Sequence, residues 1–285
     1  MIPGVDVLAG LEQLEGAKLP TFYSPGGKQR ATELAETAGN CAHYLELLYP
    51  KKVPAKLLVL NEKDWTKRVT YPYGLIAGSN NILWYSILGP ENHVFKDMIP
   101  FHNNSPKSLQ RKLEHLLPEQ SSPYLYACHK WFEAVMVHEY AHNYNKVNNV
   151  DIKLSWFDEL FCDYILYAYL KRYGETNPLD LQMFELFSEI TFVGGLGIVK
   201  HRTIEDFERL YTDVGSANYC WYQGWFNLGA MNLYDQFGED FIGKIIALYQ
   251  AESGFDSTSE QLVSRLDIEL EGFKDWYDEW IKQHP

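Results

Sequence analysis

The sequence is poor in cysteine and contains no long apolar segment. Its four cysteines lie far apart and form no CxxC pair: Cys41, Cys128, Cys162 and Cys220. Neither a disulfide framework nor a thiolate zinc site is therefore indicated, and we expect reduced thiols. No stretch approaches the ~20 apolar residues of a membrane span, and acidic residues interrupt residues 1–18 where a signal peptide would be apolar. These absences predict a cytoplasmic protein with no membrane partner, although an already removed leader would leave the same pattern.

Positive charge is also scarce. The chain has 25 Lys and Arg residues against 38 Asp and Glu residues, which gives a formal net charge of -13. Nucleic-acid binding requires clustered cationic groups that displace phosphate counterions, so we expect no nucleic-acid partner. With 46% hydrophobic residues, 285 residues are enough for one large core, and we find no repeat or low-complexity linker. The chain is expected to form one compact unit.

Patterning predicts an α+β fold. We expect a helix over residues 29–48, a strand over 56–60, and a hairpin of extended stretches 68–77 and 81–87 joined at residues 78–80. From Pro123 onward the pattern is helical, with capping boxes starting at Ser155 and Thr203. The predicted organisation is a sheet-containing N-terminal subdomain, residues 1–147, and a mostly helical C-terminal subdomain, residues 148–285. A cleft between two such parts is a common substrate site.

The most informative segment is an apolar helical run from Trp131 that contains His138-Glu139-x-x-His142. Residues four apart lie on the same face of a helix, so both imidazoles can reach one ion. Glu139 flanks the pair and is placed to take a proton from water without itself being a ligand. Burial of two unpartnered imidazoles on so apolar a helix would be costly, which favours a zinc site over a chance spacing.

A catalytic zinc site usually has three protein ligands, so a third is required. The helix predicted to begin at Ser155 carries Glu159 and Asp163 on one face. We predict Glu159 as the third ligand and Asp163 as the acceptor for the free N–H of a ligating histidine. The alternative is that these acids form a solvated face with Asp158.

These residues together resemble the gluzincin zinc metallopeptidases, in particular the thermolysin-like catalytic domain of the aminopeptidase N and glycyl aminopeptidase group. The similarity rests on the His138-Glu139-x-x-His142 motif followed, after sixteen residues, by Glu159 and then Asp163. It spans roughly residues 29–250 and implies a thermolysin-like zincin fold, one zinc ion per chain and a peptide or protein substrate. The segment at Tyr222 is similar to the Tyr-x-Lys-Gly segment of that group, which implies that Tyr222 stabilises the oxyanion. Tyr219 is the alternative.

The resemblance also implies that residues 74–87 contain the edge strand along which a substrate backbone pairs. The substrate-binding residues would then be Gly74, Ala77, Gly78, Ser79 and Asn80. Aminopeptidases of this group carry Gly-x-Met-Glu-Asn on that strand, and its Glu holds the free amine of the substrate. This chain has Gly-Ser-Asn-Asn at residues 78–81 instead. An extended peptide in an open cleft is therefore expected rather than an aminopeptidase substrate, unless Glu133 or Glu91 supplies the missing acid.

The predicted function is zinc-dependent hydrolysis of peptide bonds with Glu139 as the general base. Two alternatives remain open: a zinc-bearing scaffold that binds peptides or a partner without turnover, and a hydrolase of a non-peptide amide or ester. His93 and His201 are weaker candidates for oxyanion donors. We further expect a flexible Gly-rich loop at residues 192–197, and core packing rather than partner binding for the amphipathic helix at 273–280.

Overall fold

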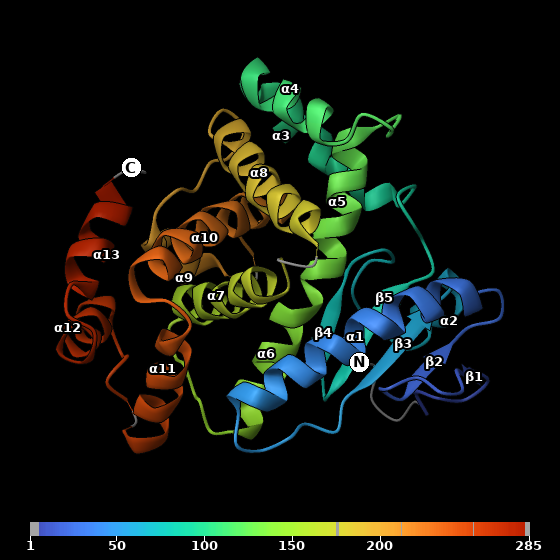
Figure 1. Ribbon diagram of the computed structural model, residues 1–285, viewed down its shortest axis with the longest axis horizontal. Coiled ribbons are helices and arrows are strands. Elements are labelled where there is room, and N and C mark those ends of the chain that lie inside the picture. The colour runs from blue at the N-terminus through green and yellow to red at the C-terminus, as the bar shows by residue number, and fades with distance from the viewer. Residues whose placement is uncertain (1–5, 175–176, 212, 253, 283–285) are drawn as a thin grey trace.

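A computed structural model describes residues 6–174, 177–211, 213–252 and 254–282. The fold is α+β, as predicted. A small sheet lies at one side of the molecule and most of the later helices lie at the other, with a long pair of helices, α5 and α6, between them (Figure 1). Within the described residues, every helix is too short or too polar to cross a membrane.

The sheet is mixed and has the order β1-β2-β3-β5-β4. Its strands are β1 (Glu12–Gln13), β2 (Thr21–Tyr23), β3 (Lys56–Leu60), β4 (Ala77–Ser79) and β5 (Ile82–Ser86). Strands β2, β3 and β5 run parallel, whereas β1 and β4 are antiparallel to their neighbours. Strand β4 is therefore an edge strand whose outer side offers unpaired backbone groups.

The strand predicted at 56–60 is confirmed, but the strand predicted over 68–77 is wrong. Of residues 68–79, only Ala77–Ser79 pairs with β5, and the residues before Ala77 form a loop. This loop is held by side chains: the Trp65 indole donates to the carbonyl oxygen of Tyr71 (2.7 Å). The hairpin turn is also displaced, because Asn80 and Asn81 both adopt left-handed φ values of 51° and 62°. Asparagine tolerates this conformation, which a two-residue hairpin turn requires.

Side chains of the central strands alternate between two cores. Leu57 and Val59 of β3 face the main core, whereas Leu58 and Leu60 face a smaller cluster around Trp65. Alternation with a period of two is the geometry of a strand, and here both faces are apolar because both are covered. Helices α1 and α6 pack against the strands on the main side.

Seven helical elements lie between residues 6 and 147, the described portion of the N-terminal part. They are α1 (Lys28–Leu48), α2 (Glu62–Thr66), the 3-10 helix η1 (His93–Met98), α3 (Ile99–Asn104), α4 (Lys107–Leu116), α5 (Pro123–Ala134) and α6 (Met136–Val147). Pro123 occupies the first turn of α5, as expected. The helical run predicted through His142 is interrupted only at Val135, a turn residue that separates α5 from α6. The backbone hydrogen bond from Glu139 N to Val135 O (3.0 Å) spans this junction.

The C-terminal part is entirely helical among the described residues. It contains α7 (Ser155–Gly174), α8 (Pro178–Gly195), α9 (Ile204–Leu210), α10 (Ser216–Phe237), α11 (Asp240–Ala251), α12 (Ser259–Glu269) and α13 (Phe273–Lys282). Helix α7 is buried along most of its length against α6, α8 and α10. Helix α13 buries Trp280 against Trp225 (ring centroids 4.8 Å apart), which is core packing.

Two local predictions for this part need correction. Residues 192–195 are the end of α8 rather than a loop, and a Cβ at Gly194 would lie 1.9 Å from the carbonyl oxygen of Phe101. The glycine therefore permits close packing of α8 on α3. The cap of α7 is not the Ser155 side chain: the backbone N–H of Trp156 donates to the carboxylate of Glu208 (2.6 Å). The Thr203 cap of α9 is confirmed, because its hydroxyl accepts from Asp206 N (3.1 Å).

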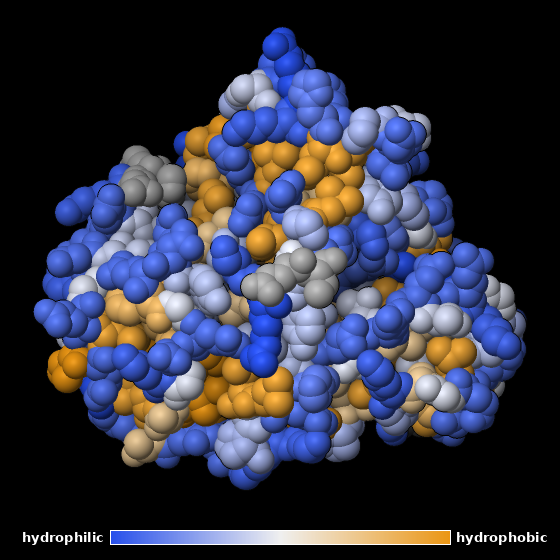
Figure 2. Space-filling view, viewed as in Figure 1, coloured by the Kyte–Doolittle hydropathy of each residue, from blue (hydrophilic) through white to orange (hydrophobic). Residues whose placement is uncertain are grey.

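The surface seen in this view is mainly hydrophilic, in keeping with the net charge of -13. Figure 2 shows apolar side chains gathered near α8 and, at the lower left, near α11 and α12. The predicted division at residue 147 falls at the end of α6. It stays a prediction, and α6 and α7 on its two sides pack directly against each other.

Candidate metal centre

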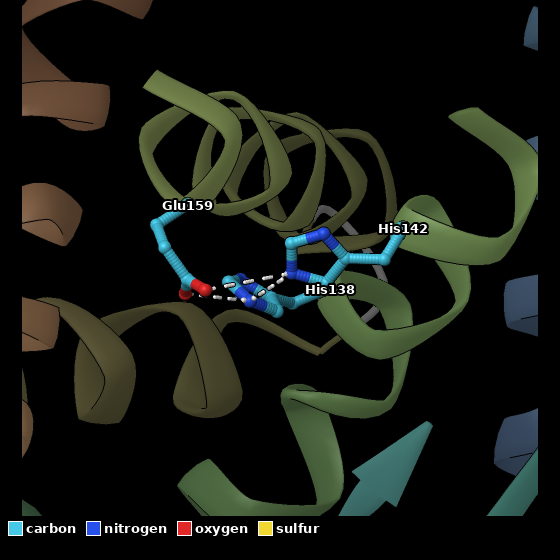
Figure 3. Close-up of side chains that lie close together, drawn as sticks. All are labelled: His138, His142 and Glu159. Carbon is cyan, nitrogen blue, oxygen red and sulfur yellow. Dashed lines mark hydrogen bonds and ion pairs between the residues drawn. The ribbon is translucent and has the colours of Figure 1, made fainter. Parts of the chain in front are cut away.

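Helix α6 places His138 and His142 one turn apart, and α7 brings Glu159 against them (Figure 3). The two Nε2 atoms lie 3.0 Å apart. Nε2 of His138 is 3.3 Å from Oε2 of Glu159, and Nε2 of His142 is 3.9 Å from Oε1. The structure thus brings together the three residues predicted as ligands, from segments that are separate in the sequence.

The spacing of these atoms fits a metal ion. Three potential ligand atoms from His138, His142 and Glu159 all lie within 4.8 Å of one another. Tetrahedral ligands about 2.0–2.1 Å from an ion are separated from one another by roughly 3.3 Å. The two Nε2 atoms are 3.0 Å apart, and they lie 3.3 Å and 3.9 Å from the Oε2 and Oε1 atoms of Glu159, respectively, so the observed separations bracket that value. The group could therefore hold a metal ion after only small side-chain adjustments.

Each histidine has a carboxylate on its other ring nitrogen. Nδ1 of His138 lies 2.7 Å from Oδ1 of Asp163, and Nδ1 of His142 lies 2.9 Å from Oδ2 of Asp158. A carboxylate at Nδ1 fixes the tautomer that leaves Nε2 free to bind a metal. Asp163 is placed where the sequence predicted, whereas Asp158 was assigned only to a solvated face. A signal for Asp158 was present in the sequence, because an acid next to the predicted ligand Glu159 on the same helix also lies near the two histidines.

Asp158 also belongs to a second group of potential ligands, with His142 and Cys162. Sγ of Cys162 lies 3.4 Å from Nδ1 of His142. This group uses the opposite ring nitrogen from the one that faces His138 and Glu159. It therefore supports the orientation of His142 rather than competing for the same ligand atom.

The charges in this cluster shift one another's pKa values. Burial lowers the pKa of His138, but the Asp163 and Glu159 carboxylates outweigh it and hold that pKa well above its usual value. For His142, burial is likewise outweighed by Asp158, and the pKa rises to about 9. Burial raises the pKa of Asp163 to about 6. Glu159 is also buried, yet its hydrogen bond and charge interaction with His138 keep its pKa far below the usual range.

Glu159 is held by three donors from the helical part. The hydroxyl groups of Tyr211 and Tyr219 donate to Oε1 (2.5 Å) and Oε2 (3.1 Å), and the Gln223 amide donates to Oε2 (2.6 Å). The side chain of Glu159 is only 2% exposed, so these bonds replace the water that a carboxylate requires. Of these three residues, the sequence predicted only Tyr219 as part of the site. Tyr211 and Gln223 carried no recognisable motif of their own.

The structure does not bring Tyr222 to this cluster. Its hydroxyl donates to the carbonyl oxygen of Thr203 (2.8 Å), and its ring is fully buried against Phe207 and other aromatic side chains. On α10, Tyr219 and Gln223 are four residues apart and both contact Glu159, whereas Tyr222 lies about 100° around the helix from Gln223 and packs towards α9. The structure thus places Tyr219, the alternative, beside Glu159 and binds the Tyr222 hydroxyl at Thr203, and the oxyanion role of either residue stays a prediction.

Glu139 lies between the metal cluster and the edge strand. A Cβ placed on Gly78 of β4 would be 2.8 Å from Oε2 of Glu139 and 3.0 Å from its carbonyl oxygen. Among the described residues, no side chain or backbone group donates a hydrogen bond to the Glu139 carboxylate. Its carboxylate is thus packed beside the strand but uncommitted, as a general base must be.

The residues predicted on the substrate strand divide into two groups. Gly78 and Ser79 lie on the edge strand and are partly exposed. Ala77 is buried in the small cluster around Trp65, and Asn80 forms the turn. Gly74 is buried in the preceding loop, where its carbonyl oxygen accepts from the Asn92 amide (2.7 Å). Gly74 thus lies outside the strand, with its carbonyl oxygen bound to the protein, and its role as a substrate contact stays a prediction.

A cavity of about 540 Å³ lies beside Glu139. Glu139, Tyr219 and Gln223 contribute to its wall, which otherwise comes from the loop before β4, from η1 and α3, from the junction of α5 and α6, and from the start of α10. His93 lines the cavity, whereas His201 lies 3.6 Å from Asp206 at the start of α9. His93 thus remains near the site, and His201 is accounted for by its carboxylate partner.

The two acids considered as amine anchors are engaged elsewhere. Glu133 contacts Arg30 (2.5 Å), Lys130 (2.7 Å) and His129 (3.3 Å). Glu91 accepts a hydrogen bond from the backbone N–H of Gly89 (2.9 Å). Neither lines the cavity beside Glu139. Comparison of the chain with family models, with curated proteins and with solved structures gives no match.

Proposed function

We propose that this chain is a zinc-dependent peptidase. The observation that carries the proposal is the convergence of His138, His142 and Glu159 on one point, with Glu139 beside them and facing a cavity. Two histidines and one carboxylate form a recurrent ligand set of catalytic zinc, and three protein ligands leave a position for water or substrate. A purely structural zinc site usually has four protein ligands, which favours catalysis over a scaffold role.

The proposed mechanism assigns one role to each group. Bound zinc supplies Lewis-acid chemistry: it lowers the pKa of water and polarises the scissile carbonyl. Glu139 takes a proton from the attacking water and delivers it to the leaving amine. Asp163 and Asp158 hold the two imidazoles with Nε2 facing the metal position. Gln223 keeps the carboxylate of Glu159 in its orientation.

Tyr219 and Tyr211 are the proposed donors to the oxyanion. Both hydroxyl groups donate to the Glu159 carboxylate and so lie next to the metal position, and each would turn its single hydrogen from Glu159 to the oxyanion. Tyr219 also lines the cavity that Glu139 faces, which makes it the stronger of the two. Loss of one such donor typically lowers the rate by about 10²–10³.

An extended peptide matches the site better than a free N-terminus. The outer side of β4 offers backbone groups for pairing with a peptide chain next to Glu139. An aminopeptidase would need a carboxylate to neutralise the substrate ammonium, since an unpaired charge in a closed site is costly. Glu133 is neutralised by Arg30 and Lys130, so it is not free for that role.

The first test separates the metal from the chemistry. Purified protein should contain about one zinc per chain, and His142→Ala should lose most of it. Glu139→Gln should retain zinc and fold but lose hydrolysis, because the amide keeps the shape and removes the base. Glu114→Gln, an exposed acid on α4, is the matched control and should be fully active.

Substrate mapping completes the test. N-acetylated and free forms of the same peptides are incubated with the protein, and the cleavage sites are identified by mass spectrometry. Internal cuts that tolerate acetylation support the proposal. Release of single residues from free N-termini alone would contradict the extended-substrate assignment. Stoichiometric zinc without any cleavage would favour the binding scaffold, and cleavage restricted to non-peptide amides or esters would favour the second alternative.

A further inference from the structure

A second cavity, of about 260 Å³, lies where α1, α5, the end of α7 and the start of α8 meet near the middle of the view (Figure 1). Among the described residues that line the two cavities, Trp131 is the one that this cavity shares with the cavity beside Glu139. No described residue of its wall is a candidate metal ligand. The second cavity is therefore separate from the candidate metal centre, and what it binds does not depend on the proposed peptidase function.

The charged groups of its wall leave an excess of negative charge. The wall contains one base and three acids: Lys130, Glu36, Glu133 and Asp180. Lys130 is already paired with Glu133 (2.7 Å), which also contacts Arg30. In the described part of the chain, no cationic side chain lies within ion-pair distance of Glu36 or Asp180. Two of the three carboxylates thus face the cavity region without a cation of the protein beside them.

Asp180 is the stronger anchor of these two acids. It is half-buried in the first turn of α8, whereas Glu36 is exposed on α1. Burial raises the pKa of Asp180, and the charge of Lys130 only partly offsets this effect. The side-chain amide of Asn177 donates a hydrogen bond to Asp180 but cannot neutralise its charge. A cation in the cavity would therefore stabilise the ionised carboxylate.

Aromatic rings form much of the remaining wall, and they belong to Trp131, Tyr169, Tyr173 and Phe184. The rings of Tyr169 and Tyr173 lie side by side, with their centroids 4.7 Å apart. The face of an aromatic ring is electron-rich and attracts a cation, and the same surface packs against an alkyl chain. The wall thus combines unpaired carboxylates with surfaces that favour an organic cation over an anion.

Two helix ends also border the cavity. Tyr173 and Gly174 belong to the last turn of α7, whose C-terminal end carries a partial negative charge. The N-terminal end of α8 carries the opposite partial charge, and Asp180 lies within its first turn. The partial charges of the two helix ends oppose each other, so the preference for a cation comes from the carboxylates and the rings.

The size and polar groups of the cavity define the cation further. At about 260 Å³, it lies just below the ~300–1,000 Å³ of pockets for drug-sized ligands, which suits a compact molecule. A primary ammonium group can donate three hydrogen bonds, and the Asp180 carboxylate and the Thr37 hydroxyl offer acceptors in this wall. A quaternary ammonium group has no hydrogen to donate and would leave these acceptors without a partner.

We propose that this cavity binds a small primary alkylamine in its protonated form, with the ammonium group on Asp180 and the alkyl chain against the aromatic rings. A free amine and the side chain of a peptide lysine offer the same chemistry. Both ligands would enter a site that is distinct from the metal centre.

The first experiment measures the binding of n-butylamine by calorimetry at pH 7, where the amine is protonated. Ionic strength is held constant, because a chain with a net charge of -13 also attracts cations without a specific site. Butyrate and butanol have the same chain length without the positive charge and are the ligand controls. We expect saturable binding of one n-butylamine per chain and no binding of either control. Absence of n-butylamine binding, or equally tight binding of butyrate, would overturn the proposal.

Asp180→Asn tests the anchor, because the amide keeps the shape of the side chain and removes its charge. Binding of n-butylamine should weaken by about 10- to 100-fold, as expected for the loss of a hydrogen bond between charged groups. Asp235→Asn, at an exposed position of α10 outside the cavity wall, is the matched control and should bind as wild type does. Unfolding temperatures are measured for both variants. Unchanged binding by folded Asp180→Asn would contradict the assignment.

Glu36→Gln is the second variant, and its exposed position keeps it informative even where Asp180→Asn fails to fold. Its loss of affinity should be smaller than that of Asp180→Asn, because solvent screens an exposed charge. Unchanged binding by both Glu36→Gln and Asp180→Asn would show that the carboxylates of this wall do not hold the amine. When Asp180→Asn does not fold, unchanged binding by Glu36→Gln alone counts against the proposal.

Two further arms locate the site and identify the source of the amine. Binding should be the same with and without zinc, because no described residue of the wall is a candidate metal ligand. A requirement for zinc would place the amine at the metal centre and overturn the proposal. N-acetyl-lysine amide is then compared with n-butylamine. Equal affinity assigns the cavity to a lysine side chain, and binding of n-butylamine alone assigns it to a free amine.

Discussion

The two carboxylates behind the histidines allow a matched comparison. Asp163 and Asp158 make the same contact, with distances of 2.7 and 2.9 Å to Nδ1 of their histidines. They differ in exposure: the side chain of Asp163 is 1% exposed and that of Asp158 is 31% exposed. Replacement of such a partner typically weakens metal affinity by about 10- to 100-fold. Because water can substitute for Asp158 but not for Asp163, we expect Asp163→Asn near the upper end and Asp158→Asn near the lower end.

Zinc affinity is measured by competition with a chromophoric chelator at one fixed pH, with the unfolding temperature of each metal-free variant as the control for folding. Because both histidines contact Glu159 and each other, the two carboxylates belong to one network, and the double variant measures the coupling between them. The reasoning is refuted if Asp163→Asn binds zinc as tightly as wild type. It is also refuted if Asp158→Asn shows the larger loss.

Three further predictions concern packing, charge and metal. Gly78→Ala should lower kcat by roughly 10- to 100-fold with zinc retained, because the added Cβ would displace Glu139 and misplacement of a catalytic group by about 1 Å costs that much in rate. Gly243→Ala is the control, because a Cβ at that position would meet no atom within 4 Å. Glu133→Gln should lower the free energy of unfolding by about 1.5–3 kcal/mol, because it removes the charged partner of Arg30 and leaves that side chain with only its 3.4 Å contact to the more exposed Glu33. Burial raises the pKa of Glu133, but its partners His129, Arg30 and Lys130 outweigh burial and hold that pKa far below its usual value. The contribution of Glu133 to the unfolding free energy is therefore present above about pH 4.3 and is lost as the pH falls further. Urea unfolding between pH 7 and pH 3 should therefore show a larger fall in the unfolding free energy for wild type than for the variant. Chelation of zinc should lower the unfolding free energy by about 2.7 kcal/mol relative to protein with free zinc at 100 times its Kd, which calorimetry checks.

Much of the fold followed from local patterns. The strand at 56–60, the helix starting near residue 28 and the proline start of α5 were all predicted from periodicity and turn residues. The strand predicted over 68–77 was wrong, because apolar residues of this loop, such as Val69 and Tyr73, pack against the cluster around Trp65 instead of pairing in the sheet. Helices α3 and α4 carried too short a pattern to stand out. The Gly-rich end of α8 was misread because its glycines serve close helix packing rather than a turn.

The sequence by itself determined the chemistry of the site. Residues four apart on a helix must share a face, so His138 and His142 converge whatever surrounds them, and Glu139 must flank them. Only the tertiary structure decided which groups complete the site. Tyr211 and Gln223 reach Glu159 because α9 and α10 pack against α7, and no spacing along the chain encodes that packing. The apolar cavity beside Glu139 likewise exists only where four distant segments meet, since hydrophobic residues that line a pocket and those that fill a core have the same pattern in a sequence.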